Sequence, residues 1–229
     1  EIQEISHFAK TVSSFAKAEK LFNIILENPK EKILVFARYK KTLEFLASEF
    51  AKRHIVFREF HGSMPLEKKD LAIKAFEKDV PILLSTESGG EGRNLQFCNT
   101  VINYDLPWNP LRIEQRIGRV HRFGQKREVF IFNLALKNSV EEYILDILDA
   151  KLNMFELVIG EMDMILGNLG RNGQNHDFED MVMGIWTSQS TEEIKRGFAK
   201  LGKELISAKE RYGESKELDR ELFEEDYQL

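Results

Sequence analysis

The sequence is short of cysteine and of long apolar runs, and both shortages limit what the protein can be. Cys98 is the single cysteine among 229 residues, so the chain can form no internal disulfide, which fits a reducing cytoplasm. No apolar run approaches the ~20 residues of a membrane-spanning helix, and no secretory signal is visible. Because the chain begins Glu1-Ile2-Gln3 rather than with Met, we expect a fragment of a longer cytoplasmic protein with no membrane partner.

Three site-forming patterns are also missing. The sequence has no Gly-x-x-x-x-Gly-Lys-Ser/Thr loop to cradle nucleotide phosphates. It has no strand ending in an Asp-Glu-x-His type of acidic motif that would hold Mg²⁺. Its five histidines are scattered, and with one cysteine they offer no metal-ligand spacing. The sequence therefore excludes a complete P-loop ATPase site and a zinc site within this chain.

The charge of the chain is small but unevenly distributed. The 38 acidic and 33 basic residues give a net charge of -5. Residues 214–229 contain seven acids and two bases, so this end carries the whole excess and the remainder is balanced at 31 of each. A balanced body can still present a local basic face to nucleic acid. The acidic end has a plainer interpretation as a solvated terminus.

The first 137 residues alternate helical and strand patterns. Apolar spacing predicts a lead-in helix over 6–27, which Asn28-Pro29 ends. Further helices are predicted at 42–50, from Pro65 to 78, and between the last two strands. The predicted strands are 32–37, 54–60, 80–85, 100–104 and 128–134. This α/β order implies a parallel sheet with helices on both faces.

Residues 138–229 have a purely helical pattern. Helices are predicted at 139–156, 177–186 and 191–212, with an irregular Met-, Gly- and Asn-rich stretch at 160–173. We therefore expect two domains: an α/β domain over 1–137 and an all-helical extension with an acidic tail over 138–229.

Two polar segments bear the residue types of a ligand site. Ser85 to Leu95 follows the apolar strand 80–85 and contains three glycines, which let a backbone approach a ligand closely. Glu114 to Gln125 contains Arg119 and Arg122, which a helix would place on one face. Two guanidiniums on one face suit a phosphate chain. Taken singly, the segments are also typical of an ordinary glycine-rich turn and a solvated basic helix end.

In this order, with Asn103 to Pro110 between them, the two segments resemble the second RecA-like lobe of superfamily two helicases and translocases. Residues 85–95 resemble motif V, 115–125 motif VI, 33–39 motif IV, and 61–64 the glycine-bearing segment between motifs IV and V. Trp108-Asn109-Pro110 and the ending His121 to Gln125 resemble the Swi/Snf branch, particularly its bacterial and archaeal members. The resemblance implies a RecA-like sheet.

The resemblance also implies roles for particular residues at an ATP site. Arg119 and Arg122 would act as arginine fingers on the β- and γ-phosphates of ATP when two lobes close, and Gln115 would position them. The cofactor-binding set near the ribose would be Gly90, Glu91 and Gly92. ATP and Mg²⁺ would be held mainly by the first lobe, so this chain alone is expected to hydrolyse essentially no ATP.

Nucleic-acid contacts are expected beside the strand ends, because hydroxyls and backbone N–H groups bind phosphate oxygens without reading sequence. The expected contacts are Arg38, Gly62, Ser85, Thr86, Ser88 and Trp108. Two of these residues have a plainer interpretation, Arg38 as a surface salt bridge and Trp108 as a core ring.

The function implied by the resemblance is that of a DNA-dependent ATPase that translocates on double-stranded DNA and remodels protein–DNA complexes. Its partners would be the first lobe of the parent chain and a DNA-bound protein such as a polymerase. The alternatives are an RNA helicase or restriction-type translocase lobe, and a non-catalytic nucleic-acid-binding module. The pair Arg119 and Arg122 argues against the module, whereas fold analogy alone does not fix the substrate.

Overall fold

A computed structural model of the chain divides into two compact units. Unit 1 comprises the described residues of Glu1–Leu106 and Arg119–Ala135, and unit 2 those of Pro107–Gly118 and Leu136–Leu229. The structure describes residues 15–87, 95–121, 125, 127–151, 154, 160–169 and 178–224, with the backbone alone at 150–151 and 219–224. The chain thus leaves unit 1 after Leu106 and returns to it at Arg119.

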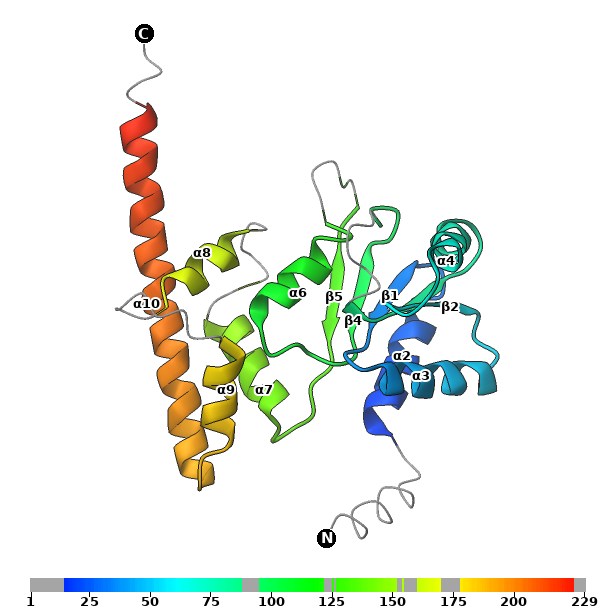
Figure 1. Cartoon of the computed structure of the whole chain (residues 1–229), viewed down its shortest axis with the longest axis horizontal. Coiled ribbons are helices and arrows are strands. Elements are labelled where there is room, and N and C mark those ends of the chain that lie inside the picture. The colour runs from blue at the N-terminus through cyan, green and yellow to red at the C-terminus, as the bar shows by residue number, and fades with distance from the viewer. Residues whose placement is uncertain are drawn as a thin grey trace. The chain divides into compact units, whose positions relative to one another are not determined.

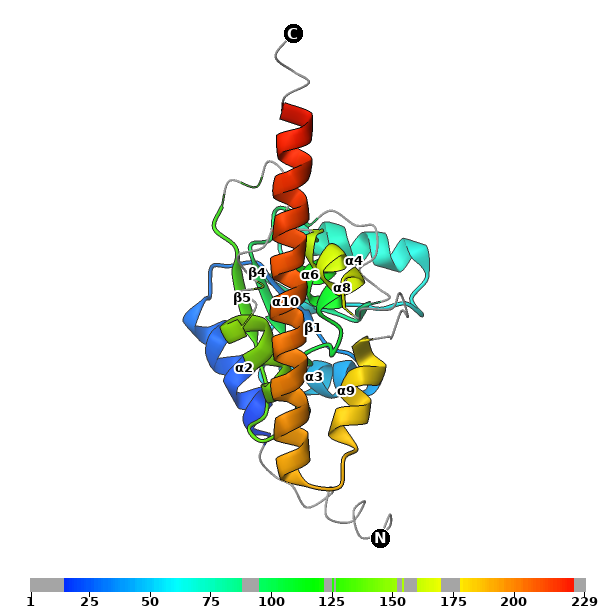
Figure 2. The same cartoon turned by 90° about the vertical axis from the view of Figure 1, so that its left-hand side faces the viewer.

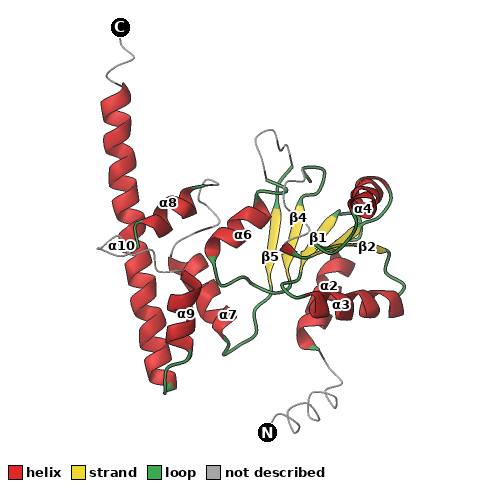
Figure 3. Cartoon of the chain, viewed as in Figure 1, coloured by secondary structure: helices red, strands yellow, loops and turns green. Residues whose placement is uncertain are grey.

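Unit 1 is built on a five-stranded sheet with the strand order β2-β3-β1-β4-β5. The strands are β1 (Ile33–Phe36), β2 (Phe57–Phe60), β3 (Ile82–Ser85), β4 (Thr100–Asn103) and β5 (Phe130–Asn133). Each neighbouring pair is parallel, and the central β1 aligns its Ile33 with Ile82 on one side and Thr100 on the other. The carboxyl ends of the strands therefore lie along one edge (Figure 3).

Helices cover both faces of this sheet, as the sequence predicted. The helices of unit 1 are α2 (Ala16–Glu27), α3 (Lys40–Lys52) and α4 (Leu66–Lys78). Helices α2 and α3 lie on one face and α4 lies on the other (Figure 1). Helix α2 ends where the sequence indicated, because the Asn28 amide donates to the Ile24 carbonyl at 2.8 Å and Pro29 follows.

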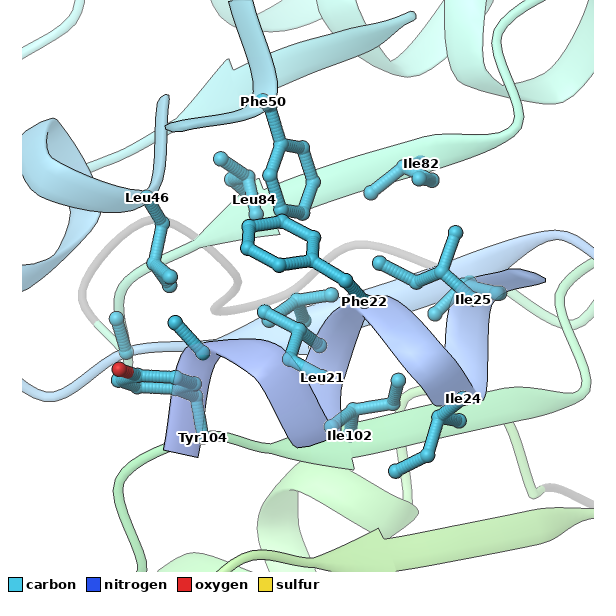
Figure 4. Close-up of a cluster of buried hydrophobic side chains, with 14 of the residues drawn as sticks. Leu21, Phe22, Ile24, Ile25, Leu46, Phe50, Ile82, Leu84, Ile102 and Tyr104 are labelled. Carbon is cyan, nitrogen blue, oxygen red and sulfur yellow. The ribbon is translucent and has the colours of Figure 1, made fainter. Parts of the chain in front are cut away.

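The alternating side chains of the strands separate two hydrophobic cores. Val35 of β1 faces a core with Leu21 and Phe22 of α2 and Phe50 of α3, which Figure 4 draws around the Phe22 and Phe50 rings. Those two ring centroids lie 5.4 Å apart, and Phe50 has no exposed surface. The next residue, Phe36, points the other way, into the core beneath α4. Burial on both faces explains why the central strands read as continuous apolar runs.

Cys98 belongs to the core beneath α4 and has no exposed surface. Its thiol donates to the Lys32 carbonyl at 2.9 Å. Burial raises the pKa of the Cys98 thiol to about 12. The group is therefore a neutral, protected thiol at physiological pH rather than a nucleophile.

Unit 2 is helical, and its longest helix runs beside two shorter ones. Its elements are α6 (Pro110–Ile117), α7 (Val140–Asp146), a π-helical turn η1 (Ile147–Lys151), α8 (Glu161–Gly167), α9 (Phe178–Trp186) and α10 (Thr191–Glu224). Figure 2 shows α10 passing α8 and α9. Tyr143 of α7 stacks on Phe198 of α10 with ring centroids 4.8 Å apart.

Three predictions for the helical region were wrong in detail. The stretch expected to be irregular contains α8, because Met162 and Ile165 are one turn apart and both are fully buried. The helix expected to end at 212 continues to Glu224, so most of the acidic tail is helical. The helix predicted over 139–156 is α-helical only to Asp146 and continues as the π-helical turn.

The start of α10 is where the sequence placed it. Ser190 precedes the helix, and its hydroxyl accepts a hydrogen bond from the Glu193 backbone N–H at 3.2 Å. Glu193 in turn accepts from the Gln189 backbone N–H at 3.1 Å. This reciprocal pattern satisfies N–H groups that have no partner within the helix. Among the described residues, we find no helix with the length and apolar character of a membrane span.

Candidate nucleotide and nucleic-acid site

The carboxyl edge of the sheet brings several predicted site residues together in unit 1. Parallel strands present the ends of β1, β2 and β3 side by side, and in open α/β sheets ligands bind beyond this edge. Backbone hydrogen bonds join the strand ends, from Ala37 N–H to the Ser85 carbonyl at 2.9 Å and from Thr86 N–H to the Phe60 carbonyl at 3.1 Å. These hydrogen bonds hold the residues that follow β1, β2 and β3 in defined positions relative to one another.

Arg38 follows β1 at this edge and is fixed by Asp105, which follows β4. The Arg38 backbone N–H donates to Asp105 Oδ2 at 2.9 Å. The other carboxylate oxygen lies 4.0 Å from Lys17 Nζ, and the Arg38 guanidinium lies 5.5 Å from the centre of the Tyr39 ring. Asp105 therefore orients the backbone at Arg38. Asp105 was not among the residues predicted from the sequence, although an acidic residue shortly after a strand is a signal for such a role.

Gly62 lies in the turn between β2 and α4 and is exposed. The turn is closed by its own residues, since the Met64 N–H donates to the His61 carbonyl at 3.1 Å and Ser63 Oγ lies 2.9 Å from His61 Nδ1. His61 is thus engaged within the turn. Gly62 leaves the outer side of the turn without a side chain, which permits close approach of a ligand.

Ser85 and Thr86 lie at the end of β3 but are buried, 1% and 7% exposed respectively. The Ser85 hydroxyl donates to the Thr86 carbonyl at 2.9 Å. In this conformation the two side chains stabilise the end of the strand and do not face solvent. Burial could not be read from the sequence, because a strand end can be either inside or outside.

Several predicted site residues lie outside the described part of the chain. They are Ser88, Gly90, Glu91, Gly92 and Arg122. Their roles stay predictions.

Arg119 is not on a helix, which corrects the helical reading of the two arginines. Helix α6 ends at Ile117, and Arg119 lies in the turn that follows. The Leu95 N–H donates to the Arg119 carbonyl at 3.1 Å, and Val120 is fully buried in unit 1. The chain leaves the helical path because burial of Val120 and this hydrogen bond bring it back to unit 1. Spacing on a helix face therefore does not relate Arg119 to Arg122.

Helix α6 carries the remaining predicted residues within unit 2. Asn109 caps its start, with Oδ1 accepting from the Leu111 N–H at 3.0 Å, and Pro110 occupies the first turn. Trp108 just before the cap is half-buried, and Gln115 is exposed. The Trp-Asn-Pro step thus forms a helix start that fixes the direction of α6.

Arg116 is a buried arginine that no sequence motif marked as a candidate. It is 2% exposed and lies on α6 between Gln115 and Ile117. A guanidinium so deeply buried does not face solvent in this structure. Within the described ranges, no group of three or more His, Cys, Asp and Glu residues could hold a metal ion.

Comparison with known proteins identifies the fold's relatives. Residues 16–124 match the family described as the helicase conserved C-terminal domain. The chain is 42% identical over 182 residues to the uncharacterized ATP-dependent helicase YqhH of Bacillus subtilis, which covers 80% of this chain and 32% of that protein. It is 34% identical over 165 residues to human chromodomain-helicase-DNA-binding protein 1, covering 70% of this chain and 10% of that one.

A solved structure agrees with these relatives. The crystal structure of the C-terminal part of the Fun30 ATPase domain matches with a TM-score of 0.54 and 26% identity, covering 80% of this chain and 62% of that one. This chain belongs to the Swi/Snf helicase family. It holds the RecA-like C-terminal lobe of such a helicase. It spans about a third of the length of YqhH and about a tenth of that of the chromodomain protein.

Proposed function

We propose that this chain is the second ATPase lobe of a motor that translocates on double-stranded DNA and remodels protein–DNA complexes. The observation that carries the proposal is Swi/Snf membership together with the position of Arg119. Arg119 lies shortly after α6, the helix that presents Gln115, and its carbonyl accepts a hydrogen bond from the Leu95 N–H within unit 1. A backbone held in this way suits a guanidinium that must lie beside a phosphate when two lobes close.

In this proposal Arg119 and Arg122 are arginine fingers. A guanidinium beside the transferring phosphoryl group stabilises the charge that develops there, and such groups are worth about 10³ to 10⁵ in rate. Gln115, exposed on α6, positions the fingers or a phosphate oxygen through its amide. Closing and opening of the two lobes with each hydrolysis would move the DNA backbone by one small step.

The donors that this chain offers suit phosphate rather than metal. Guanidinium and amide groups bind phosphate oxygens, whereas Mg²⁺ is bound by carboxylates. The described residues contain no cluster of three or more His, Cys, Asp and Glu that could hold a metal ion. We therefore propose that the first lobe of the parent holds ATP and Mg²⁺, with Gly90, Glu91 and Gly92 lining the ribose side. This chain by itself would hydrolyse essentially no ATP.

The DNA contacts are proposed to lie along the carboxyl edge of the sheet. Arg38 and Gly62 would contact the phosphate backbone, because Gly62 is exposed and Arg38 is partly so. Ser85 and Thr86 are buried, so their part would be to hold the end of β3. Trp108 would approach the DNA from the start of α6.

The division of labour follows the two domains expected from the sequence. Residues 1–137 would be the motor lobe, although their helix α6 belongs to unit 2. Residues 138–229 would be an extension that docks on a further part of the parent or on a protein bound to the DNA, such as a polymerase. We propose no partner more specific than a protein bound to duplex DNA.

Displacement of a third strand from a DNA triplex tests the proposal, because a motor on the duplex strips that strand without separating the duplex. We expect the full-length parent with ATP and Mg²⁺ to displace the third strand, and to fail with a non-hydrolysable ATP analogue. An unwinding activity on RNA duplexes without triplex displacement would place the protein on the RNA helicase branch instead. ATP-independent binding alone would favour the non-catalytic module.

A further inference from the structure

Helix α6 is packed into the helical unit, although the sequence assigned it to the lobe. Ile113 of α6 is fully buried within the chain, and α6 neighbours α8. Arg112 Nε lies 3.4 Å from Glu179 Oε1 of α9. The helix that presents Gln115 therefore belongs to unit 2, as do α8 and α9.

Glu114 makes the most specific of these contacts. Its Oε1 accepts hydrogen bonds from the Gly160 N–H at 2.8 Å and the Met162 N–H at 3.4 Å, at the start of α8. A carboxylate in this place satisfies N–H groups that α8 cannot pair itself, and it faces the positive end of the helix dipole. Gly160 has a φ of +102°, a conformation that favours glycine. We call this contact the Glu114 clasp.

The clasp lies beside the residues that the proposed function uses. Gln115 directly follows Glu114 and is exposed, while Arg116 on the next position is buried. Helix α6 then ends at Ile117, two residues before Arg119. We propose that Glu114 is a positioning residue through which the C-terminal extension sets the rate of ATP hydrolysis. This inference rests on the proposed roles of Gln115 and Arg119.

The physical reason is that α6 is too short to position itself. An isolated helix of its 8 residues is not stable in water, so its location depends on what it packs against. The clasp resists sliding and rotation of α6 relative to α8, because one carboxylate oxygen binds two N–H donors, those of Gly160 and Met162, at the start of α8. A displacement of about 1 Å at a catalytic group can cost about 100-fold in rate.

Three variants of the full-length parent test the clasp. Glu114→Ala is expected to lower kcat about 10- to 100-fold, with the KM for ATP and the affinity for duplex DNA changed little, because binding groups stay in place. Glu114→Gln keeps an oxygen that can accept from both N–H groups, so it is expected to restore most of kcat. Lys216→Ala is the matched control, since it removes the 2.5 Å ion pair between α10 and Glu161 of the same α8 without touching α6.

Hydrogen exchange gives a readout that does not depend on turnover. The amides of Gly160 and Met162 are expected to exchange faster in Glu114→Ala and normally in Glu114→Gln. If the two amides exchanged faster but kcat were unchanged, Glu114 would not link the extension to ATP hydrolysis, and the proposed function would still stand. If Lys216→Ala lost as much kcat, a general destabilisation of the extension would explain the loss in Glu114→Ala, and the specific role of Glu114 would be wrong. A wild-type parent that hydrolyses no ATP would overturn both the coupling and the proposed function.

Discussion

Arg122→Ala in the full-length parent lowers ATP turnover at least ~100-fold, and Arg119→Ala does the same, while affinity for duplex DNA stays nearly unchanged. The reason is that a finger stabilises charge that is present mainly in the transition state, so its loss appears in kcat rather than in binding. Arg119→Lys should rescue little, because an ammonium cannot reproduce the two-pronged guanidinium contact. Steady-state ATPase assays and DNA titrations of the same preparations measure both quantities.

A matched arginine in the same unit serves as the control for these variants. Arg127 is half-exposed and pairs with Glu31 at 2.5 Å, so Arg127→Ala removes one positive charge from unit 1 without touching the proposed site. It should leave turnover within about two-fold, as is usual for a surface ion pair. If Arg122→Ala weakened DNA binding as much as turnover, Arg122 would be a contact to the phosphate backbone and the finger assignment would be wrong.

Phe50→Ala lowers the free energy of unfolding of unit 1 by about 3–5 kcal/mol, the range for removing a buried phenylalanine. Phe50 is fully buried, and its ring centroid lies 5.4 Å from those of both Phe22 and Phe57. Its removal leaves a cavity between α2, α3 and β2, and the sheet cannot collapse to fill it without breaking strand pairing. Guanidinium unfolding followed by circular dichroism measures the change.

Two internal comparisons make this stability test specific. Leu26→Ala removes a side chain that is 70% exposed from the neighbouring helix, and should change stability by no more than about 0.5 kcal/mol. Both tryptophans, Trp108 and Trp186, belong to unit 2. Their fluorescence midpoint should therefore shift less than the midpoint by circular dichroism. A loss in Phe50→Ala below about 1 kcal/mol would show that the core collapses around the missing ring.

The sheet could be predicted from the sequence because its central strands are buried on both faces. A run such as Ile33 to Phe36 has no polar face, so its pattern cannot be mistaken for that of a surface strand. Asn28-Pro29 marks the end of α2, and Asn109-Pro110 marks the start of α6. The predicted strands at 54–60 and 128–134 were longer than β2 and β5, since an apolar pattern does not mark the residue at which pairing between strands begins or ends.

The parts that failed depend on contacts between distant segments. Nothing in the local sequence says that Leu95 binds the Arg119 carbonyl, which is why the end of α6 was misjudged. Helix α8 is held by Glu114 from 46 residues away, and Ser85 is buried by the strands beside it. Asp105 orients Arg38 across 67 residues of sequence. Such tertiary contacts override propensity, and they set the geometry of the candidate site.

The measurement that tests the central claim most directly is ATP turnover by the full-length parent with no nucleic acid, with duplex DNA and with single-stranded RNA. We expect little turnover without nucleic acid or with RNA, and strong stimulation by duplex DNA. Stimulation by RNA and not by duplex DNA would contradict the claim.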